Sequence, residues 1–333
     1  MKAGGSTRSS VGIINLATGQ YHSIPVPSTG HSIVGHPTDR TRVIMLGQRP
    51  LPQSVEIDLN EMKVTQVINA GADRYFYGHG VFDAGGRYLY STENKSDSDL
   101  GFISIRDAQN FQLIGGFPSH GVGPHELDFF DDGRLTVIAN GGLESKTVDE
   151  LASEVPNMKS TLDIVETASG KLLQSYQLPH QKLSIRHLAL GANGEIAVSL
   201  KSYSSTPLPY ACVALGNINS GISIPEVPPE MLPQLQSSAF AIELSADAKL
   251  AAVTHPEGKL LSIWDVENRA FVNAIPLGVM PEGVTRLPNQ QSFLLNSLYG
   301  ALAEIDKDGT RVTRDEIANV TGLNWKHACP WTV

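Results

Sequence analysis

The sequence predicts an all-β fold, a seven-bladed β-propeller that forms one domain over residues 1–333. Three observations predict it: a strand–turn–strand pattern that recurs about every 45 residues, a second series of turns between further short apolar runs, and no convincing helical periodicity. Four-stranded units at this spacing are typical of propellers, in which each blade is a small twisted sheet beside a central channel. A β-solenoid is the main alternative, but its repeats would be shorter and more regular.

The first series of turns follows the opening strand of each repeat. Each turn joins two short apolar runs, which is the signal of a strand–turn–strand unit. Six of these turns are complete, and they lie at 38–40, 85–87, 131–134, 193–194, 247–249 and 289–290. The second series follows a later strand, and its seven members lie at 17–20, 59–62, 107–110, 168–171, 217–220, 266–269 and 306–309.

The difference between six first turns and seven second turns predicts that both chain ends share one blade. In this first blade, residues 1–26 supply outer strands and residues 320–333 supply the inner strand, so that no unpaired sheet edge remains. The six further blades are expected at 27–70, 71–118, 119–180, 181–229, 230–276 and 277–319. An acidic insertion at 144–159 is the nearest candidate for a helical turn.

Composition describes a soluble protein with a proper core, since 41% of the residues are hydrophobic and 18% are charged. The net charge of −9 contains no Lys/Arg-rich block, so nucleic acid is not expected as a partner. No apolar run reaches the ~18–20 residues that span a bilayer, and no secretory signal is visible at residues 1–8. Cys212 and Cys329 form no CxxC pair, and we expect two free, buried thiols in a monomer.

One position in each repeat is usually polar, near the start of the inner strand. Aligned on the first turns, the residues at this position are His31, His79, His125, His187, a residue near Ala241, Glu282 and His327. All inner strands of a propeller run in the same direction along the channel, so their starts meet at one mouth. Five of the ten histidines of the chain would therefore converge there.

These converging histidines predict a site for a transition metal or an anionic ligand. Neutral imidazoles with a carboxylate suit Cu, Zn or Fe, and the predicted metal ligands are His31, His79, His125, His187 and His327. The alternative is that polar residues line a wet channel and hydrogen-bond neighbouring blades, since a histidine can donate and accept at once.

Two charged residues adjoin these histidines in the sequence. Strand alternation predicts that Glu126 and Arg186 point to different faces from His125 and His187. We expect Arg186 to pair with Glu126 or Glu93 and so hold blades together. An anion clamp at the channel mouth is the alternative.

Motifs over most of the chain resemble one bacterial propeller family that is designated only as a domain of unknown function. The resemblance rests on residues 77–82 with 90–94, 123–127 with 139–142, and 183–188. It implies a seven-bladed propeller of the YVTN, WD40 or quinoprotein amine dehydrogenase-like kind. Members are often exported and encoded near imelysin-type and di-haem oxidoreductase genes, which implies a periplasmic setting linked to iron. The motif positions carried over are His79, Glu93, Asn94, His125, Glu126, Asn140, Arg186 and His187.

The sequence leads to three functional hypotheses. The first is a propeller that binds a metal or a small ligand at the histidine-lined mouth through the motif positions and Glu282. The second is a lactonase-like hydrolase, in which His, Arg and Glu polarise a carbonyl and activate water. The third is an interaction scaffold for a periplasmic protein partner. No GxSxG, P-loop or HExxH motif is present, which favours binding over catalysis.

Overall fold

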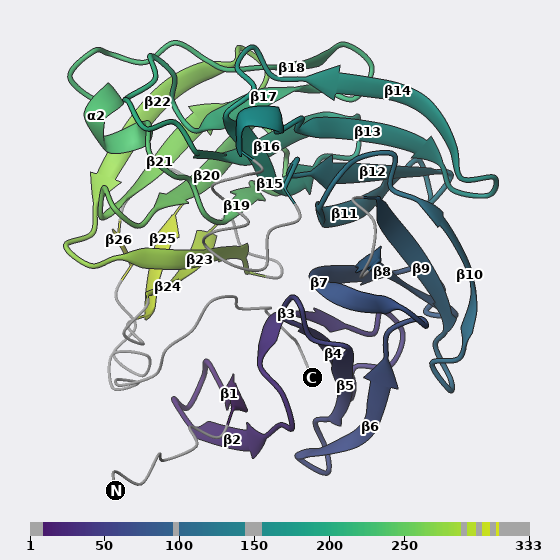
Figure 1. The fold of residues 1–333 in the computed structure, drawn as a ribbon. Coiled ribbons are helices and arrows are strands. Elements are labelled where there is room, and N and C mark those ends of the chain that lie inside the picture. Colours follow the sequence, from purple (N-terminus) through teal and green to yellow (C-terminus); the bar gives the residue numbers. More distant parts are fainter. Residues whose placement is uncertain are drawn as a thin grey trace, which may run out of the picture.

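The computed structural model describes residues 9–95, 100–143, 155–287, 292–297, 302–306 and 311–312. These residues form six four-stranded antiparallel sheets and one two-stranded sheet. Figure 1 shows the six larger sheets as blades around a common centre, with the first strand of each blade nearest the centre. The prediction of an all-β propeller is confirmed.

The blades follow one another along the chain without exchange of strands. The first three are β3–β6 (Gly30–Gly35, Arg42–Gly47, Gln53–Asp58, Lys63–Asn69), β7–β10 (Arg74–Phe82, Tyr88–Lys95, Gly101–Asp107, Leu113–Pro118) and β11–β14 (Pro124–Phe130, Leu135–Asn140, Thr161–Glu166, Lys171–Gln177). The last three are β15–β18 (Leu183–Leu190, Glu195–Ser202, Val213–Asn217, Gly221–Ser223), β19–β22 (Ile242–Leu244, Leu250–His255, Leu260–Asp265, Ala270–Pro276) and β23–β26 (Pro281–Arg286, Ser292–Ser297, Leu302–Asp306, Arg311–Val312). Two short helices, η1 (Val155–Asn157) and α2 (Leu232–Leu235), complete the described elements.

The prediction of seven blades was wrong, because the described residues form six. Within the described part of the chain, the N-terminal strands β1 (Ser10–Ile14) and β2 (Tyr21–Pro25) pair with each other alone and form a hairpin. A turn signal such as that at 17–20 marks one pair of strands, but it does not show how many further strands belong to the same sheet. Counting turns therefore overestimates the number of blades. The segment 320–333, which was expected to supply an inner strand, lies outside the described residues.

Apolar side chains on the faces of the blades form the core. The second and third strands carry most of them, and every residue of β12 is buried, whereas the outermost strand β14 is largely exposed. Trp264 on β21 is fully buried, packs against Phe271 with ring centroids 5.3 Å apart, and donates a hydrogen bond to the Ser262 hydroxyl. Buried aromatic residues of this kind contribute large apolar areas to the stability of the fold.

The inner strands are irregular in their pairing with the second strands. In five of the six, the pairing with the second strand shifts register, near the start of β3, β11 and β23 and in the middle of β7 and β15. A β-bulge of this kind bends the strand and redirects its side chains. The residues within the shifts include His31, His79, His125, His187 and Glu282.

Hydroxyl groups on the second strands support these openings. Thr92 on β8 accepts a hydrogen bond from the His79 amide and donates to the His79 carbonyl. Ser199 on β16 accepts from the His187 amide at 3.2 Å and donates to the Phe240 carbonyl at 2.7 Å. Backbone groups that a bulge removes from the sheet are thereby satisfied, and the openings are held in place.

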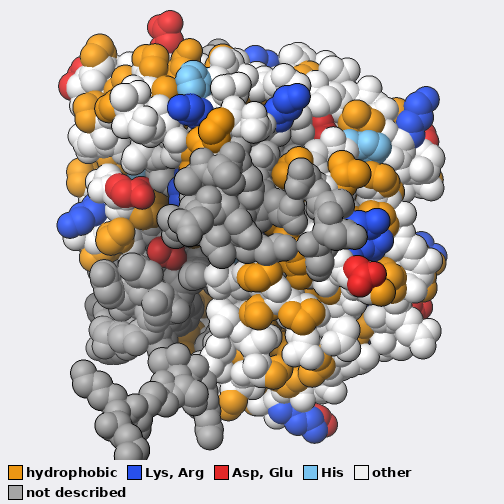
Figure 2. Space-filling view, in the orientation of Figure 1, with side chains coloured by type: hydrophobic (Ala, Val, Ile, Leu, Met, Phe, Trp, Pro, Cys, Tyr) orange, Lys and Arg blue, Asp and Glu red, His pale blue; other side chains and the backbone are white. Residues whose placement is uncertain are grey.

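Three further observations concern the surface, the helices and one cysteine. Lys and Arg side chains lie apart from one another on the face in Figure 2, without a continuous basic area among its described side chains. Among the described helices, none is long and apolar enough to cross a bilayer. Cys212 is buried and free, and burial raises the pKa of its thiol to about 12.

Candidate functional site

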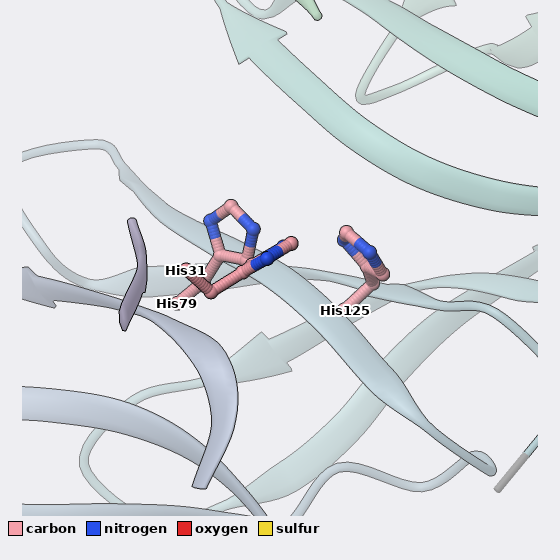
Figure 3. A group of neighbouring side chains, drawn as sticks. All are labelled: His31, His79 and His125. Carbon is pink, nitrogen blue, oxygen red and sulfur yellow. The ribbon is translucent and has the colours of Figure 1, made fainter. Parts of the chain in front are cut away.

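Four histidines on the inner strands of four successive blades lie together. His31, His79, His125 and His187, which we call the histidine cluster, come from β3, β7, β11 and β15. The ring centroid of His79 lies 4.9 Å from that of His31 and 5.1 Å from that of His125, and the rings of His125 and His187 are 4.6 Å apart. Figure 3 shows the first three side chains pointing into one space from different strands.

The cluster offers two groups of close ligand atoms among the described residues. One nitrogen from each of His31, His79 and His125 lies within 4.8 Å of the others, and the same holds for ligand atoms of His79, Glu126 and His187. Because His79 belongs to both groups, the two form one continuous constellation. A β-bulge redirects side chains, so the adjacent residues His125 and Glu126 of β11 can both belong to these groups.

Glu126 on β11 joins two of these histidines. Its Oε1 lies 3.1 Å from Nδ1 of His79, and its Oε2 lies 3.3 Å from Nδ1 of His187. The Leu188 amide also donates to Oε2, at 2.8 Å. Burial opposes ionisation of this carboxyl, but the two histidines outweigh it and hold the pKa of Glu126 well below its usual range. A carboxylate that accepts from Nδ1 leaves the Nε2 lone pair of the same ring available to a metal.

Burial favours the neutral form of two of the rings. Burial lowers the pKa of His125 well below its usual value, and the neighbouring Arg186 and histidines lower it further. Burial also lowers the pKa of His187, although Glu126 opposes the shift. Nδ1 of His125 is buried and has no hydrogen-bond partner among the described residues. Leaving such an atom unsatisfied costs about 1–3 kcal/mol.

Gly78 allows the first two blades to approach each other. Its φ is +116°, a conformation that residues with a Cβ rarely adopt. A Cβ at this position would lie 2.4 Å from Cδ2 of His31. The glycine before His79 is therefore required for the contact between His31 and His79.

Two arginines and a tyrosine lie next to the cluster. The Tyr77 ring is 6.4 Å from that of His125, and the Arg49 guanidinium lies 4.8 Å from the Tyr77 centroid and donates to its hydroxyl. Tyr77 in turn donates to the Leu143 carbonyl at 2.5 Å. The charge of Arg186 acts on both Tyr77 and His125.

The prediction from strict strand alternation was wrong. Glu126 contacts His79 and His187, although it follows His125 directly, because the register of β11 shifts between Pro124 and Glu126. Arg186 and His187 likewise share the shift in β15. The expected partners of Arg186 are engaged elsewhere, Glu126 with the histidines and Glu93 with Arg106.

Several predicted site residues belong to neither group of close ligand atoms. Glu93 is fully buried in its own blade, where it accepts from Arg106 at 2.5 Å. Asn140 donates to the Asp163 carboxylate at 2.8 Å within its own blade, and to the carbonyl of Ser119, in the connection between β10 and β11, at 3.0 Å. Asn94 is buried on β8 opposite Tyr75. Glu282 occupies the bulge of β23 but belongs to neither group of close ligand atoms, and His327 lies outside the described residues.

Sequence reasoning missed three residues. Arg49 lies in the connection between β4 and β5 and carries no signal in the repeat pattern. Tyr77 stands two residues before His79, and that adjacency could have indicated it. Asp128 follows Glu126 at the i+2 spacing of one strand face. Burial raises the pKa of Asp128 to about 7, and the charges of Glu126 and Glu243 add to the shift.

Comparison with models of known protein families identifies the family of this chain. A family model described as "Protein of unknown function (DUF1513)" matches residues 24–327. The chain belongs to this family. No curated protein matches the chain. The family membership agrees with the resemblance found in the sequence, and it assigns no activity to the histidine cluster.

Solved structures show that the fold is widespread. A structure described as "Structure of U3-55K" has a TM-score of 0.62 and 11% sequence identity, over 84% of this chain and 78% of that chain. In all, 1507 chains of solved structures match, so the fold by itself does not indicate a function. At this level of identity the likeness shows the propeller fold alone.

Proposed function

We propose that this protein binds one transition-metal ion at the histidine cluster. The observation that carries the proposal is the convergence of four imidazoles from four blades, two of them held at Nδ1 by Glu126. The spacings of these residues in the sequence contain no local metal motif, so the fold alone brings them together.

The donor set supports a borderline or soft divalent ion. Imidazole nitrogens suit Zn, Cu and Fe, whereas Ca²⁺ and Mg²⁺ prefer oxygen ligands. Metal–nitrogen distances of about 2.0–2.1 Å for zinc would draw the rings closer together than they lie here. The lowered pKa values of His125 and His187 favour binding, because a protonated imidazole has no lone pair to donate.

The role of Glu126 follows from its contacts. Both of its carboxylate oxygens lie against Nδ1 atoms, and Oε2 also accepts from a backbone amide. We assign Glu126 the part of an orienting carboxylate, which fixes the tautomer and the ring direction of His79 and His187. Outer carboxylates of this kind tighten metal binding by about 10–100-fold.

The two other hypotheses from the sequence gain no comparable support. A lactonase would require His, Arg and Glu to be free to act on a substrate carbonyl, whereas Glu126 is engaged by two histidines. A scaffold function has no specific contact in its favour among the described residues. The periplasmic setting and the link to iron handling rest on the family resemblance and stay predictions.

Elemental analysis of the purified protein tests the proposal. We expect wild type to contain close to one Zn, Cu or Fe per chain after reconstitution, and His79→Ala/His125→Ala to contain at least about tenfold less. His22→Ala is the matched control, since His22 is exposed on β2 and should leave the metal content unchanged. Equal and negligible metal in wild type and the double variant would contradict the proposal.

A further inference from the structure

The N-terminal hairpin of β1 and β2 packs against the first blade. Val11 on β1, Ile24 on β2 and Val26 after it are buried, and they form one apolar cluster with the second and third strands of that blade. The buried residues of the blade in this cluster are Val43, Met45, Val55 and Ile57. Strand β2 also contacts β6, the outermost strand of the blade. The hairpin is thus anchored on the first blade through several buried side chains.

The turn of the same hairpin lies against the last blade. Leu16, which follows β1, packs against Leu287 and Leu294. Both of these leucines are buried, Leu294 on β24 and Leu287 directly after β23. Asn15 closes the turn, because its side-chain oxygen and its carbonyl oxygen accept hydrogen bonds from the backbone amides of the next residues. The closed turn holds Leu16 in place beside β24.

The hairpin lies where two neighbouring blades of the ring have the least contact. The inner strands of successive blades contact one another in the pairs β3–β7, β7–β11, β11–β15, β15–β19 and β19–β23. No contact of similar extent joins β23 to β3 in the described part of the chain. Figure 1 shows the hairpin beside the first blade, on the side of the last blade. Its apolar contacts therefore bridge the first and last blades.

We infer that the hairpin is a clasp that closes the ring between its first and last blades and that releases the last blade at Leu16. The two sides of the clasp differ. Several of its side chains are buried against the first blade, whereas among the described residues Leu16 alone is clustered with apolar residues of the last. Because apolar burial stabilises a contact roughly in proportion to its area, the contact at Leu16 is the weaker one and opens first.

Release at Leu16 leaves the histidine cluster assembled. The four histidines lie on the first four blades, and the first two of these blades are joined by direct hydrogen bonds. Ser32 Oγ donates to the Gly78 carbonyl at 2.6 Å, and Nε2 of His36 lies 2.8 Å from the Gly86 carbonyl oxygen. The last blade keeps its own apolar contacts with the fifth. Opening of the clasp therefore changes the ring without separating the proposed metal ligands.

Hydrogen exchange followed by mass spectrometry tests the inference on the full chain after dialysis against EDTA. Leu16→Asp places a carboxylate against buried Leu287 and Leu294, and should release the last blade. We expect the backbone amides of β23 and β24 to exchange at least about tenfold faster than in wild type, and those of β15 and β16 to be unchanged, because amides exchange through local opening. Ala17→Asp adds the same charge at the exposed neighbouring position and should exchange as wild type does.

Two results would overturn the inference. Wild-type exchange of β23 and β24 in Leu16→Asp would mean that other contacts hold the last blade. An equal increase in every blade would mean that the ring unfolds as a unit.

A milder pair of variants decides the question if Leu16→Asp fails to fold. Leu16→Ala and Leu294→Ala should each speed the exchange of β23. The double variant should add little to the faster of the two, because both substitutions remove the same contact. Effects that multiply in the double variant would count against the clasp.

The clasp and the metal site fail separately. We expect Leu16→Asp to take up as much metal as wild type, and a loss of metal would contradict the statement that the blades with the histidines stay joined. Faster exchange in a protein that takes up no metal supports the clasp and overturns the proposed function. Normal metal uptake with unchanged exchange overturns the clasp alone.

Discussion

Nδ1 of His79 lies 3.1 Å from Oε1 of Glu126, although the two residues come from different blades. The contact links β7 to β11, and the second oxygen of the same carboxylate reaches His187 on β15. Three blades therefore meet at one carboxylate. Such a link positions the imidazoles and joins the blades in a single arrangement, so the same contacts support both the fold and the site.

Replacement of Glu126 tests its contribution to the metal site. Glu126→Gln keeps the size of the side chain but removes the charge that holds the Nδ1–H groups of His79 and His187. We expect metal affinity to fall by about 10–100-fold, while the site still fills at saturating metal. Competition with a chromophoric chelator measures the affinity.

The matched control is Glu267→Gln, which changes an exposed glutamate in a turn. It should bind metal as wild type does. If Glu126 were a direct ligand, its replacement would also change the spectrum of a Co²⁺-substituted protein at saturation. An unaltered affinity in Glu126→Gln would show that the carboxylate has no part in metal binding.

The propeller fold could be predicted because turn chemistry and short apolar runs are local signals. Residues such as Gly86 and Gly133, both with positive φ, mark the turns where glycine is needed. The number of blades could not be predicted in the same way. The turn at 17–20 has the composition of the others, yet it joins only β1 and β2.

The histidines of the site could be predicted from the sequence, but the contacts of their charged neighbours could not. His31, His79, His125 and His187 share a position in the repeat, and the topology then brings them together. The bulges that redirect Glu126 and Arg186 depend on pairing between strands, which a single sequence does not reveal. Glu93 was predicted to belong to the site because it lies in a motif. Instead it pairs with the buried Arg106, a contact that the sequence does not indicate.

Gly78 offers a test of how closely the blades must approach. Gly78→Ala would place a Cβ 2.4 Å from Cδ2 of His31, on a backbone with φ of +116°. We expect a loss of about 2–4 kcal/mol in the free energy of unfolding and a lower metal content, because backbone strain and overpacking add. Chemical denaturation and elemental analysis measure the two effects.

Gly133→Ala is the control for Gly78→Ala. Gly133 has φ of +84°, but a Cβ there would meet nothing within 4 Å. Its replacement should cost about 1 kcal/mol from the backbone alone and leave the metal content unchanged. Equal costs for the two variants would mean that the contact with His31 is unimportant.

The ion pair between Arg106 and Glu93 tests whether Glu93 is structural. Both side chains are fully buried, and Arg106 also donates to Ser91 at 2.8 Å. Arg106→Met leaves the buried carboxylate without its closest partner, since the remaining Arg74 Nη1 lies 3.8 Å away, which should lower the free energy of unfolding by up to about 3–5 kcal/mol. Denaturation in urea measures this loss.

Replacing both partners provides the check on that prediction. Arg106→Met/Glu93→Leu removes the stranded charge and should be more stable than Arg106→Met. Both variants should keep the metal content of wild type, because Glu93 lies away from the histidine cluster. A loss of metal in the double variant alone would assign Glu93 to the site after all.

The burial of His255 should make the stability of the protein depend on pH, independently of the metal site. Its side chain is fully buried on β20, Nε2 lies 2.9 Å from the Ser262 hydroxyl, and burial lowers its pKa to about 3. The unfolded chain binds a proton at this residue near pH 6.5, so the stabilisation is present above that pH and is lost as the pH falls towards 3. Between pH 7 and pH 5, wild type should lose about 2 kcal/mol more than His255→Gln. His22→Gln, an exposed histidine, should follow wild type, and identical pH profiles for wild type and His255→Gln would refute the prediction.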